Sequence, residues 1–281
     1  MGFFFTKMNN GPIGVFDSGY GGLTVLKSIR EQNPLYDYIY LGDNARSPYG
    51  PRSFDVVYNY TLQGVKRLFD LGCPLVILAC NTASAKALRT IQQKDLPIIS
   101  PDNRVLGVIR PTTEEIGLIT STKNVGILGT LGTVRSKSYV IEIQKFFPGV
   151  KVIQQSCPML VPLIENNDFN NSGGEFFIKK YVDELLKKGP EIDTIVLACT
   201  HYPIIEETIK KFIPKNITLF SQGDLVAKKL KDYIIRHPEI DSRLSRNGSL
   251  KIFTTENKDV FNENAAHLFP EEIKSVKIII N

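Results

Sequence analysis

Two segments of the sequence share one order of residue types, and each could place a cysteine thiol in an active site. Residues 75–84 read LVILACNTAS, and residues 194–203 read TIVLACTHYP. An apolar, β-branched run of this kind is typical of a strand that is buried on both faces. The carboxyl ends of such strands are where ligands bind in open α/β sheets. The sequence therefore predicts that Cys80 and Cys199 lie at the binding edge of a sheet.

Two thiols in one cavity limit the chemistry that is available. A lone cysteine after a strand is more often a small buried residue than a reactive one, but a second copy favours a chemical role. If each cysteine precedes a helix, the helix N-terminus lowers the thiol pKa from about 8.5. Hydrolysis needs only one nucleophile, and dithiol redox chemistry needs sulfurs close enough to bond. Inversion of a carbon needs one group on each face, so that one thiolate removes a proton while the opposed thiol delivers another.

Further polar side chains are expected at the same edges. Asp17 ends the apolar run IGVF and could hold a substrate ammonium or tune a proton transfer, although an aspartate here also serves as a helix cap or turn residue. His201, two residues after Cys199, would stabilise a thiolate or orient a proton. Four hydroxyl and amide side chains could help to bind an anion such as a carboxylate: Ser18, Asn81, Thr82 and Thr200.

The elements that must position these residues alternate between apolar strands and helices, which predicts parallel sheets with helices on both sides. Strands are expected at residues 13–16, 38–41, 75–79, 97–99, 125–128, 152–154, 194–197, 217–220 and 250–253. The clearest helices are expected at residues 22–32, 53–71, 83–93, 135–147 and 175–188.

The alternation also contains a repeat. VGILGTLGT at Val125 matches IGVFDSGYGG at Ile13 at an offset of 112 residues, and the two cysteines are offset by 119. Two similar α/β halves could face their strand ends across a cleft, which would put Cys80 on one wall and Cys199 on the other.

Composition excludes several classes of protein. The 281 residues suffice for about two domains, and the formal charge of +5 is spread along the chain without a basic block, so no nucleic-acid partner is expected. No apolar run reaches the roughly 18 residues of a membrane span, and a cytoplasmic protein is expected. The four cysteines show neither a CxxC pair nor zinc-ligand spacing, so no structural metal or disulfide framework is indicated. The loop GYGG lacks the third glycine of GxGxxG, which argues against a dinucleotide cofactor.

Five motifs together resemble the glutamate racemases of the aspartate/glutamate racemase family: DSGYGG, GDNARSPYG, ACNTASA, CPMLVPLIE and CTHYP, in this order. The resemblance runs from about Ile13 to the C-terminus. Aspartate racemases commonly carry a glutamate in place of the histidine of CTHYP, so His201 favours glutamate as substrate. Two positions depart from the family pattern, namely Tyr20 in DSGYGG and the sequence TTEN that begins at Thr254.

The resemblance implies a cofactor-independent racemase that interconverts L- and D-glutamate, supplies D-glutamate for peptidoglycan, and works as a homodimer. The implied fold has two similar α/β domains with mainly parallel sheets, related by a pseudo-twofold axis, with the active site between them. The implied first domain is discontinuous, covering residues 1–100 and 217–281, and the second covers residues 101–216.

The family also implies roles for individual residues. Cys80 would act on D-glutamate and Cys199 on L-glutamate, with Asp17 and His201 also catalytic. The substrate-binding set that the family implies is Asp17, Ser18, Tyr49, Gly50, Asn81, Thr82, Thr200 and His201. Glu165 and Thr133 match positions near the family's site.

Two other interpretations stay open at this point. One is a non-catalytic, carboxylate-binding or thiol-sensing protein on the same fold. The other is a metal hydrolase that uses Cys80, Cys199, His201 and Asp17 as ligands, although opposite walls suit a single ion poorly.

Overall fold

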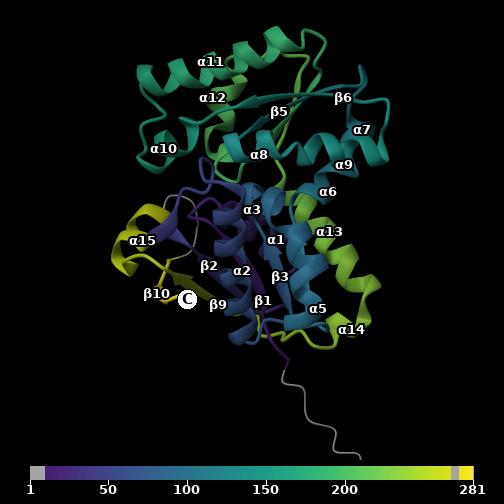
Figure 1. Cartoon of the computed structure of the whole chain (residues 1–281). Coiled ribbons are helices and arrows are strands. Elements are labelled where there is room, and N and C mark those ends of the chain that lie inside the picture. The colour runs from purple at the N-terminus through teal and green to yellow at the C-terminus, as the bar shows by residue number, and fades with distance from the viewer. Residues whose placement is uncertain (1–9, 267–271, 281) are drawn as a thin grey trace, which may run out of the picture.

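Two lobes, each built around a parallel β-sheet, make up the computed structural model, which describes residues 10–266 and 272–280 (Figure 1). The larger sheet has the strand order β10-β9-β2-β1-β3-β4, and the smaller has the order β6-β5-β7-β8. The strands of the larger sheet are β1 (Ile13–Asp17), β2 (Tyr38–Gly42), β3 (Leu75–Leu78), β4 (Arg104–Gly107), β9 (Leu250–Thr254) and β10 (Ser275–Lys277). Those of the smaller sheet are β5 (Asn124–Gly129), β6 (Lys151–Ser156), β7 (Thr194–Ala198) and β8 (Thr218–Phe220).

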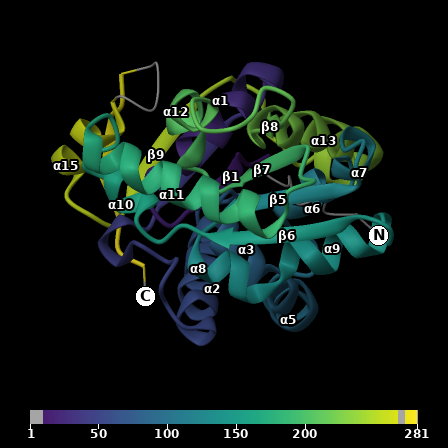
Figure 2. The same ribbon diagram turned by 90° about the horizontal axis from the view of Figure 1, so that it is seen from above.

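Helices cover both faces of each sheet, as the view from above also shows (Figure 2). In the first half of the chain they are α1 (Gly22–Gln32), η1 (Asn44–Arg46), α2 (Phe54–Asp70), α3 (Asn81–Lys86), α4 (Leu88–Thr90), η2 (Ile91–Asp95), α5 (Leu96–Ile99), α6 (Ile109–Thr113), α7 (Ile116–Ile119), α8 (Leu131–Ser136) and α9 (Ser138–Phe146). They continue with α10 (Leu160–Glu165), α11 (Ser172–Lys188), η3 (Tyr202–Ile205), α12 (Glu206–Lys210), α13 (Gly223–Arg236), α14 (Pro238–Asp241) and α15 (Lys258–Ala265).

The order of the strands shows the internal repeat directly. The run β2-β1-β3-β4 in the larger sheet has the same order as β6-β5-β7-β8 in the smaller one, and all of these pairings are parallel. Strands β9 and β10 extend the larger sheet beyond β2. The predicted fold class of two similar, mainly parallel α/β halves is confirmed.

Alternate residues of each central strand enter two different cores, which explains the unbroken apolar runs. In β1, Val15 packs into the core beneath α1 and α13, and Phe16 packs into the core beneath α2 and α3. In β5, Leu128 and Ile127 are likewise divided between the core beneath α11 and the core beneath α9. The strand ends therefore hold the loops that follow them on a rigid base.

One expected strand was wrong. Residues 97–99 lie in α5, where Pro97 stands in the first turn and Ile98 is 84% exposed. Proline fits the first turn of a helix, and a short apolar run cannot be told from a helix by its periodicity alone. The fourth strand of the larger sheet is instead β4, and neither β4 nor β10 was expected.

Sheet membership bears on the expected domain boundaries. Strand β4 pairs with β3 and strand β8 pairs with β7, so the chain passes between the sheets after Gly107 and again after Phe220. Both points lie a few residues beyond the expected boundaries at residues 100 and 216. The division into domains remains a proposal, with these crossings as its structural markers.

Candidate active site

A cavity of about 140 Å³ lies where the strand ends of the two sheets meet. Its walls include the loops that follow β1 and β3 in one lobe and β5 and β7 in the other. In each sheet the strand order reverses direction between these two strands, and open α/β sheets bind ligands at such topological switch points. The lining residues are Ser18, Ser47, Pro48, Tyr49, Gly50, Pro51, Cys80, Asn81, Thr82, Thr130, Leu131, Cys157, Pro158, Val161, Pro162, Cys199, Thr200 and His201.

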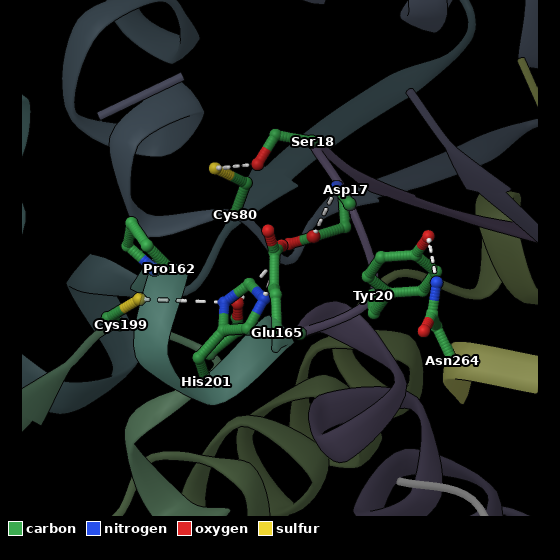
Figure 3. Close-up of polar contacts among 12 residues, drawn as sticks. Asp17, Ser18, Tyr20, Cys80, Pro162, Glu165, Cys199, His201 and Asn264 are labelled. Atoms are coloured by element: carbon green, nitrogen blue, oxygen red, sulfur yellow. Dashed lines mark hydrogen bonds and ion pairs between the residues drawn. The ribbon is translucent and has the colours of Figure 1, made fainter. Parts of the chain in front are cut away.

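Cys80 is the N-cap residue of α3, and its sulfur accepts a hydrogen bond from the Ala83 amide at 3.4 Å. The thiol in turn donates to Ser18 Oγ at 3.4 Å (Figure 3). Burial, and after it the nearby Asp17, raise the pKa of Cys80 to about 12 against the lowering effect of these two hydrogen bonds. For Cys80 the expected lowering of the pKa by the helix start is therefore wrong, because desolvation is the larger effect.

Cys199 has a different environment, although a similar apolar strand precedes it. A turn and the short η3 follow it, rather than an α-helix. Its sulfur lies 3.8 Å from His201 Nδ1, and His201 Nε2 lies 3.0 Å from Glu165 Oε1 at the end of α10 (Figure 3). Burial lowers the pKa of His201, but the contacts with Cys199 and Glu165 outweigh it and raise the pKa well above 6.5. When protonated, the imidazole places a positive charge beside the Cys199 sulfur.

Asp17 lies fully buried at the end of β1 and does not line the cavity. One carboxylate oxygen accepts from the Gly19 amide at 2.8 Å, and the other accepts from Thr200 Oγ1 at 3.4 Å. Burial raises the pKa of Asp17, and the nearby His201 opposes that rise. The carboxylate therefore connects the loop after β1 with the loop after β7 from behind the cavity wall.

Hydroxyl groups bridge the lobes on the opposite side of the cavity. Thr82 Oγ1 lies 2.9 Å from Thr130 Oγ1, which also contacts Thr133 Oγ1 at 3.1 Å. The backbones approach closely here, because a Cβ on Gly132 would lie 2.9 Å from the carbonyl oxygen of Gly50. Only glycine fits at position 132 without separating the two lobes.

Tyr49 in the loop GDNARSPYG also lines the cavity, but its hydroxyl is hydrogen-bonded to a residue outside the cavity lining. Tyr49 donates to the buried carboxylate of Asp43, which also accepts from Arg46 at 2.7 Å and from Thr255 at 2.9 Å. This buried network holds the loop over the cavity. Tyr49 and Gly50 can therefore meet a ligand through their backbone and ring edge rather than through the hydroxyl.

Tyr20, which departs from the family pattern, contacts two residues of one helix. Its ring lies 5.2 Å from that of Phe261, and its hydroxyl accepts from Asn264 at 3.3 Å (Figure 3). Both residues belong to α15, so Tyr20 packs this helix against the loop that follows β1.

The structure brings most of the expected residues together. Nine of them line the cavity: Ser18, Tyr49, Gly50, Cys80, Asn81, Thr82, Cys199, Thr200 and His201. Asp17, Glu165 and Thr133 stand one layer behind and contact residues that do line it. In the ranges that the structure describes, no three His, Cys, Asp or Glu side chains cluster in a way that could hold a metal ion.

Several lining residues were not expected from the sequence. Thr130 could have been found from the repeat, because the offset of 112 residues between Ile13 and Val125 also relates Ser18 to Thr130. Cys157 and its neighbours belong to the motif CPMLVPLIE, whose buried apolar character gave no sign that it faces a ligand.

Two parallel sheets of matching strand order share one cavity, and a thiol from each sheet reaches it, which defines a two-lobed α/β protein with its candidate site between the lobes. The model of the Asp/Glu/hydantoin racemase family matches residues 13–229, and the chain belongs to this family. Glutamate racemase of Roseobacter denitrificans is 41% identical over 240 residues, which cover 80% of this chain and 86% of that protein.

Solved structures of similar proteins agree. Glutamate racemase isoform RacE1 from Bacillus anthracis aligns with a TM-score of 0.86 at 32% identity, covering 96% of this chain and 97% of that one. Glutamate racemase from Francisella tularensis in complex with D-glutamate aligns with a TM-score of 0.83 at 31% identity over the same shares. The expected resemblance to glutamate racemases, and with it an enzyme of the racemase class, is confirmed. Within the described part of the chain, no helix has both the length and the hydropathy needed to cross a membrane.

Proposed function

We propose that this protein is a glutamate racemase that interconverts L- and D-glutamate with two cysteines and no cofactor, and that it supplies D-glutamate for peptidoglycan. Family membership and the similarity to proteins named glutamate racemase, one of them crystallised with D-glutamate, support the substrate. The observation that carries the mechanism is that Cys80 and Cys199 reach one cavity from two different sheets.

In the direction from L- to D-glutamate, the Cys199 thiolate takes the α-proton and the Cys80 thiol gives its proton to the opposite face of the carbon. Cys199 then carries a proton and Cys80 a negative charge, which is the arrangement that the reverse reaction needs. The imidazolium of His201 stabilises the thiolate at Cys199 when it forms. On the other wall, Ser18 and the Ala83 amide stabilise negative charge at Cys80.

The raised pKa of Cys80 suits its role as the acid of this cycle. A thiol with a pKa near 12 keeps its proton until the carbanionic intermediate, a far stronger base, takes it. The ammonium group that the reacting carbon carries brings a positive charge close to both sulfurs, which favours a thiolate at either one.

The substrate-binding set that we propose is Asp17, Ser18, Tyr49, Gly50, Asn81, Thr82, Thr200 and His201. Their hydroxyls, amides and loop N–H groups suit the two carboxylates of glutamate. Asp17 acts through Thr200 and the Gly19 amide, with which it shares hydrogen bonds. Glu165 and Thr133 hold His201 and Thr130 in place. We also propose a homodimer in the cytoplasm.

Incubation of the pure protein with L-glutamate in deuterated water tests the activity. We expect the α-proton signal to disappear while D-glutamate forms, with turnover much faster than on aspartate or alanine and with no loss on adding EDTA or on omitting pyridoxal phosphate. Equal rates on aspartate would contradict the assigned substrate, and loss on chelation that zinc restores would favour the metal interpretation.

Replacing each cysteine by serine tests the mechanism, because a serine hydroxyl is far less acidic than a thiol. Both Cys80→Ser and Cys199→Ser should nearly abolish racemisation in both directions. Given a glutamate analogue with a β leaving group, Cys80→Ser should still remove the α-proton of the L form and expel that group, whereas Cys199→Ser should prefer the D form. Cys73→Ala, at a buried cysteine outside the cavity lining, serves as the control and should keep its activity. The same enantiomer preference in both serine variants would refute the opposed arrangement.

A further inference from the structure

A closed ring of three buried side chains lies at the junction of the two lobes. Asn81 Nδ2 donates to Gln222 Oε1 at 2.8 Å, Gln222 Nε2 donates to the Tyr139 hydroxyl at 2.7 Å, and that hydroxyl donates to Asn81 Oδ1 at 2.7 Å. Asn81, Tyr139 and Gln222 are 2%, 0% and 4% exposed, so water does not compete for these bonds. Each side chain donates one hydrogen bond to the next and accepts one from the previous side chain, so the three bonds form a closed cycle.

The ring joins parts of the chain that otherwise belong to different lobes. Asn81 is the first residue of α3 in the larger lobe, Tyr139 belongs to α9 in the smaller lobe, and Gln222 stands between β8 and α13. Gln222 is therefore located where the chain returns from the smaller sheet to the larger one.

Gln222 also contacts the other crossing. Its amide nitrogen lies 3.2 Å from the carbonyl oxygen of Val108 and 2.8 Å from Thr112 Oγ1. Val108 directly follows β4, where the chain leaves the larger sheet, and Thr112 belongs to α6. The side chain of Gln222 thus holds both interlobe crossings together and attaches them to Asn81.

Asn81 is the residue after Cys80, and it lines the cavity. The oxygen of its side-chain amide is held by Tyr139, and the nitrogen is held by Gln222. Burial raises the pKa of Tyr139, so its hydroxyl keeps the proton that it donates to Asn81. The first turn of α3, which carries the Cys80 sulfur as its cap, is therefore connected to the smaller lobe through this ring.

We propose that Tyr139 and Gln222 are positioning residues for the racemisation: through Asn81 they fix the Cys80 wall at the distance from the Cys199 wall that proton transfer requires. This inference rests on the proposed function. Misplacing a reacting group by about 1 Å costs on the order of a hundredfold in rate, so loss of the ring should slow the step in which Cys80 exchanges a proton with the substrate carbon.

The kinetic consequence is specific to one thiol. The equilibrium constant of a racemisation is unity, so kcat/KM falls equally in both directions and cannot show which wall has moved. Primary deuterium isotope effects on kcat/KM can show it. From D-[2-²H]glutamate the slowed step breaks the labelled bond, so the isotope effect should rise; from the L enantiomer Cys199 breaks that bond before the slowed step, so the isotope effect should fall.

The test uses Tyr139→Phe and Gln222→Leu, with Tyr38→Phe as the matched control. Tyr38 is also a buried tyrosine, and its hydroxyl donates one hydrogen bond, to the Asn33 carbonyl at 2.8 Å, but it lies at the opposite end of the larger sheet from the cavity. We expect kcat to fall about tenfold or more in both ring variants, with opposite changes in the two isotope effects. Tyr38→Phe should keep the wild-type isotope effects even if it melts earlier.

Wild-type isotope effects in both ring variants would overturn the proposal, since a smaller folded fraction lowers kcat without changing them. A parallel rise in both directions would also overturn it, because it would place the defect at both walls. Failure of the wild type to racemise glutamate would count against the proposed function instead.

A second measurement does not depend on turnover. In each variant the rate of alkylation by iodoacetamide is followed at each cysteine by mass spectrometry. The ring variants should change the rate at Cys80 severalfold and leave the rate at Cys73 unchanged. An unchanged rate at Cys80 would refute the positioning role.

Discussion

Replacing Asp17 by asparagine should reduce activity far more than stability. The carboxylate is fully buried, and the groups that donate hydrogen bonds to it include the Gly19 amide and Thr200 Oγ1. An asparagine oxygen can keep the bond to Gly19, and its NH₂ group can donate to Thr200 Oγ1 instead of accepting from it. The shape and both contacts are thus preserved, while the negative charge is lost.

The two magnitudes can be compared. Rearranging one buried hydrogen bond costs about 1 kcal/mol at most, and removing a charge whose burial already raises the pKa of Asp17 offsets part of that cost. A change of about 1 kcal/mol lowers the melting temperature of a chain of this size by about 2–4 °C. Asp17 acts through Thr200, and displacing a reacting group by about 1 Å lowers kcat about a hundredfold, or about 3 kcal/mol of activation free energy.

The assay measures kcat in both directions by circular dichroism and the melting temperature of the same preparation. We expect a loss of about a hundredfold in kcat with a melting shift of a few degrees. A large melting shift with nearly intact activity would refute the reasoning and make Asp17 a structural residue.

Three further predictions concern neighbouring groups. Glu165→Gln should remove one cause of the raised pKa of His201, so the alkaline limb of the pH–rate profile should move to lower pH; an unchanged profile would contradict this. Gly21→Ala should reduce both activity and melting temperature, because its Cβ would lie 2.4 Å from Thr200 Oγ1. Wild-type kinetics in this variant would contradict the prediction, because they would show that the two loops can move apart without loss of activity. Burial alone would raise the pKa of Asp193, but four hydrogen bonds lower it from 3.8 to about 2, so Asp193→Asn should lose about 2 kcal/mol at pH 7. The difference in unfolding free energy between the wild type and Asp193→Asn, measured by urea unfolding, should shrink as the pH falls from about 4 towards 2, because the wild-type carboxylate then takes up a proton. A difference that stays constant with pH would show that the Asp193 charge is not its cause.

Much of the site could be predicted from local sequence, because parallel strands that are buried on both faces leave an apolar signature. The runs that end at Asp17, Cys80 and Cys199 mark three strand ends, and the repeat between Ile13 and Val125 marks two similar halves. Since ligands bind at that edge of a parallel sheet, the residues that follow the strands were the right ones to consider. The short strands β4 and β10 could not be predicted, because partly exposed strands of three or four residues do not form a continuous apolar run.

The electrostatic character of the two thiols was decided by tertiary structure. Similar apolar runs precede both cysteines, yet Cys80 caps α3 in a desolvated pocket, whereas Cys199 lies beside His201, which is paired with Glu165 from a segment 36 residues away. Desolvation and ion pairing depend on which groups the fold brings within a few ångströms. A local pattern of residues cannot encode those distances.

The ring of Asn81, Tyr139 and Gln222 shows the same limit. Its members are separated by up to 141 residues and belong to no common motif. The sequence by itself determined which residues stand at the strand ends, because burial and periodicity act along the chain. Only the packing of the two lobes decided which side chains complete one another's hydrogen bonds, because those bonds form between segments that meet only after both sheets have folded.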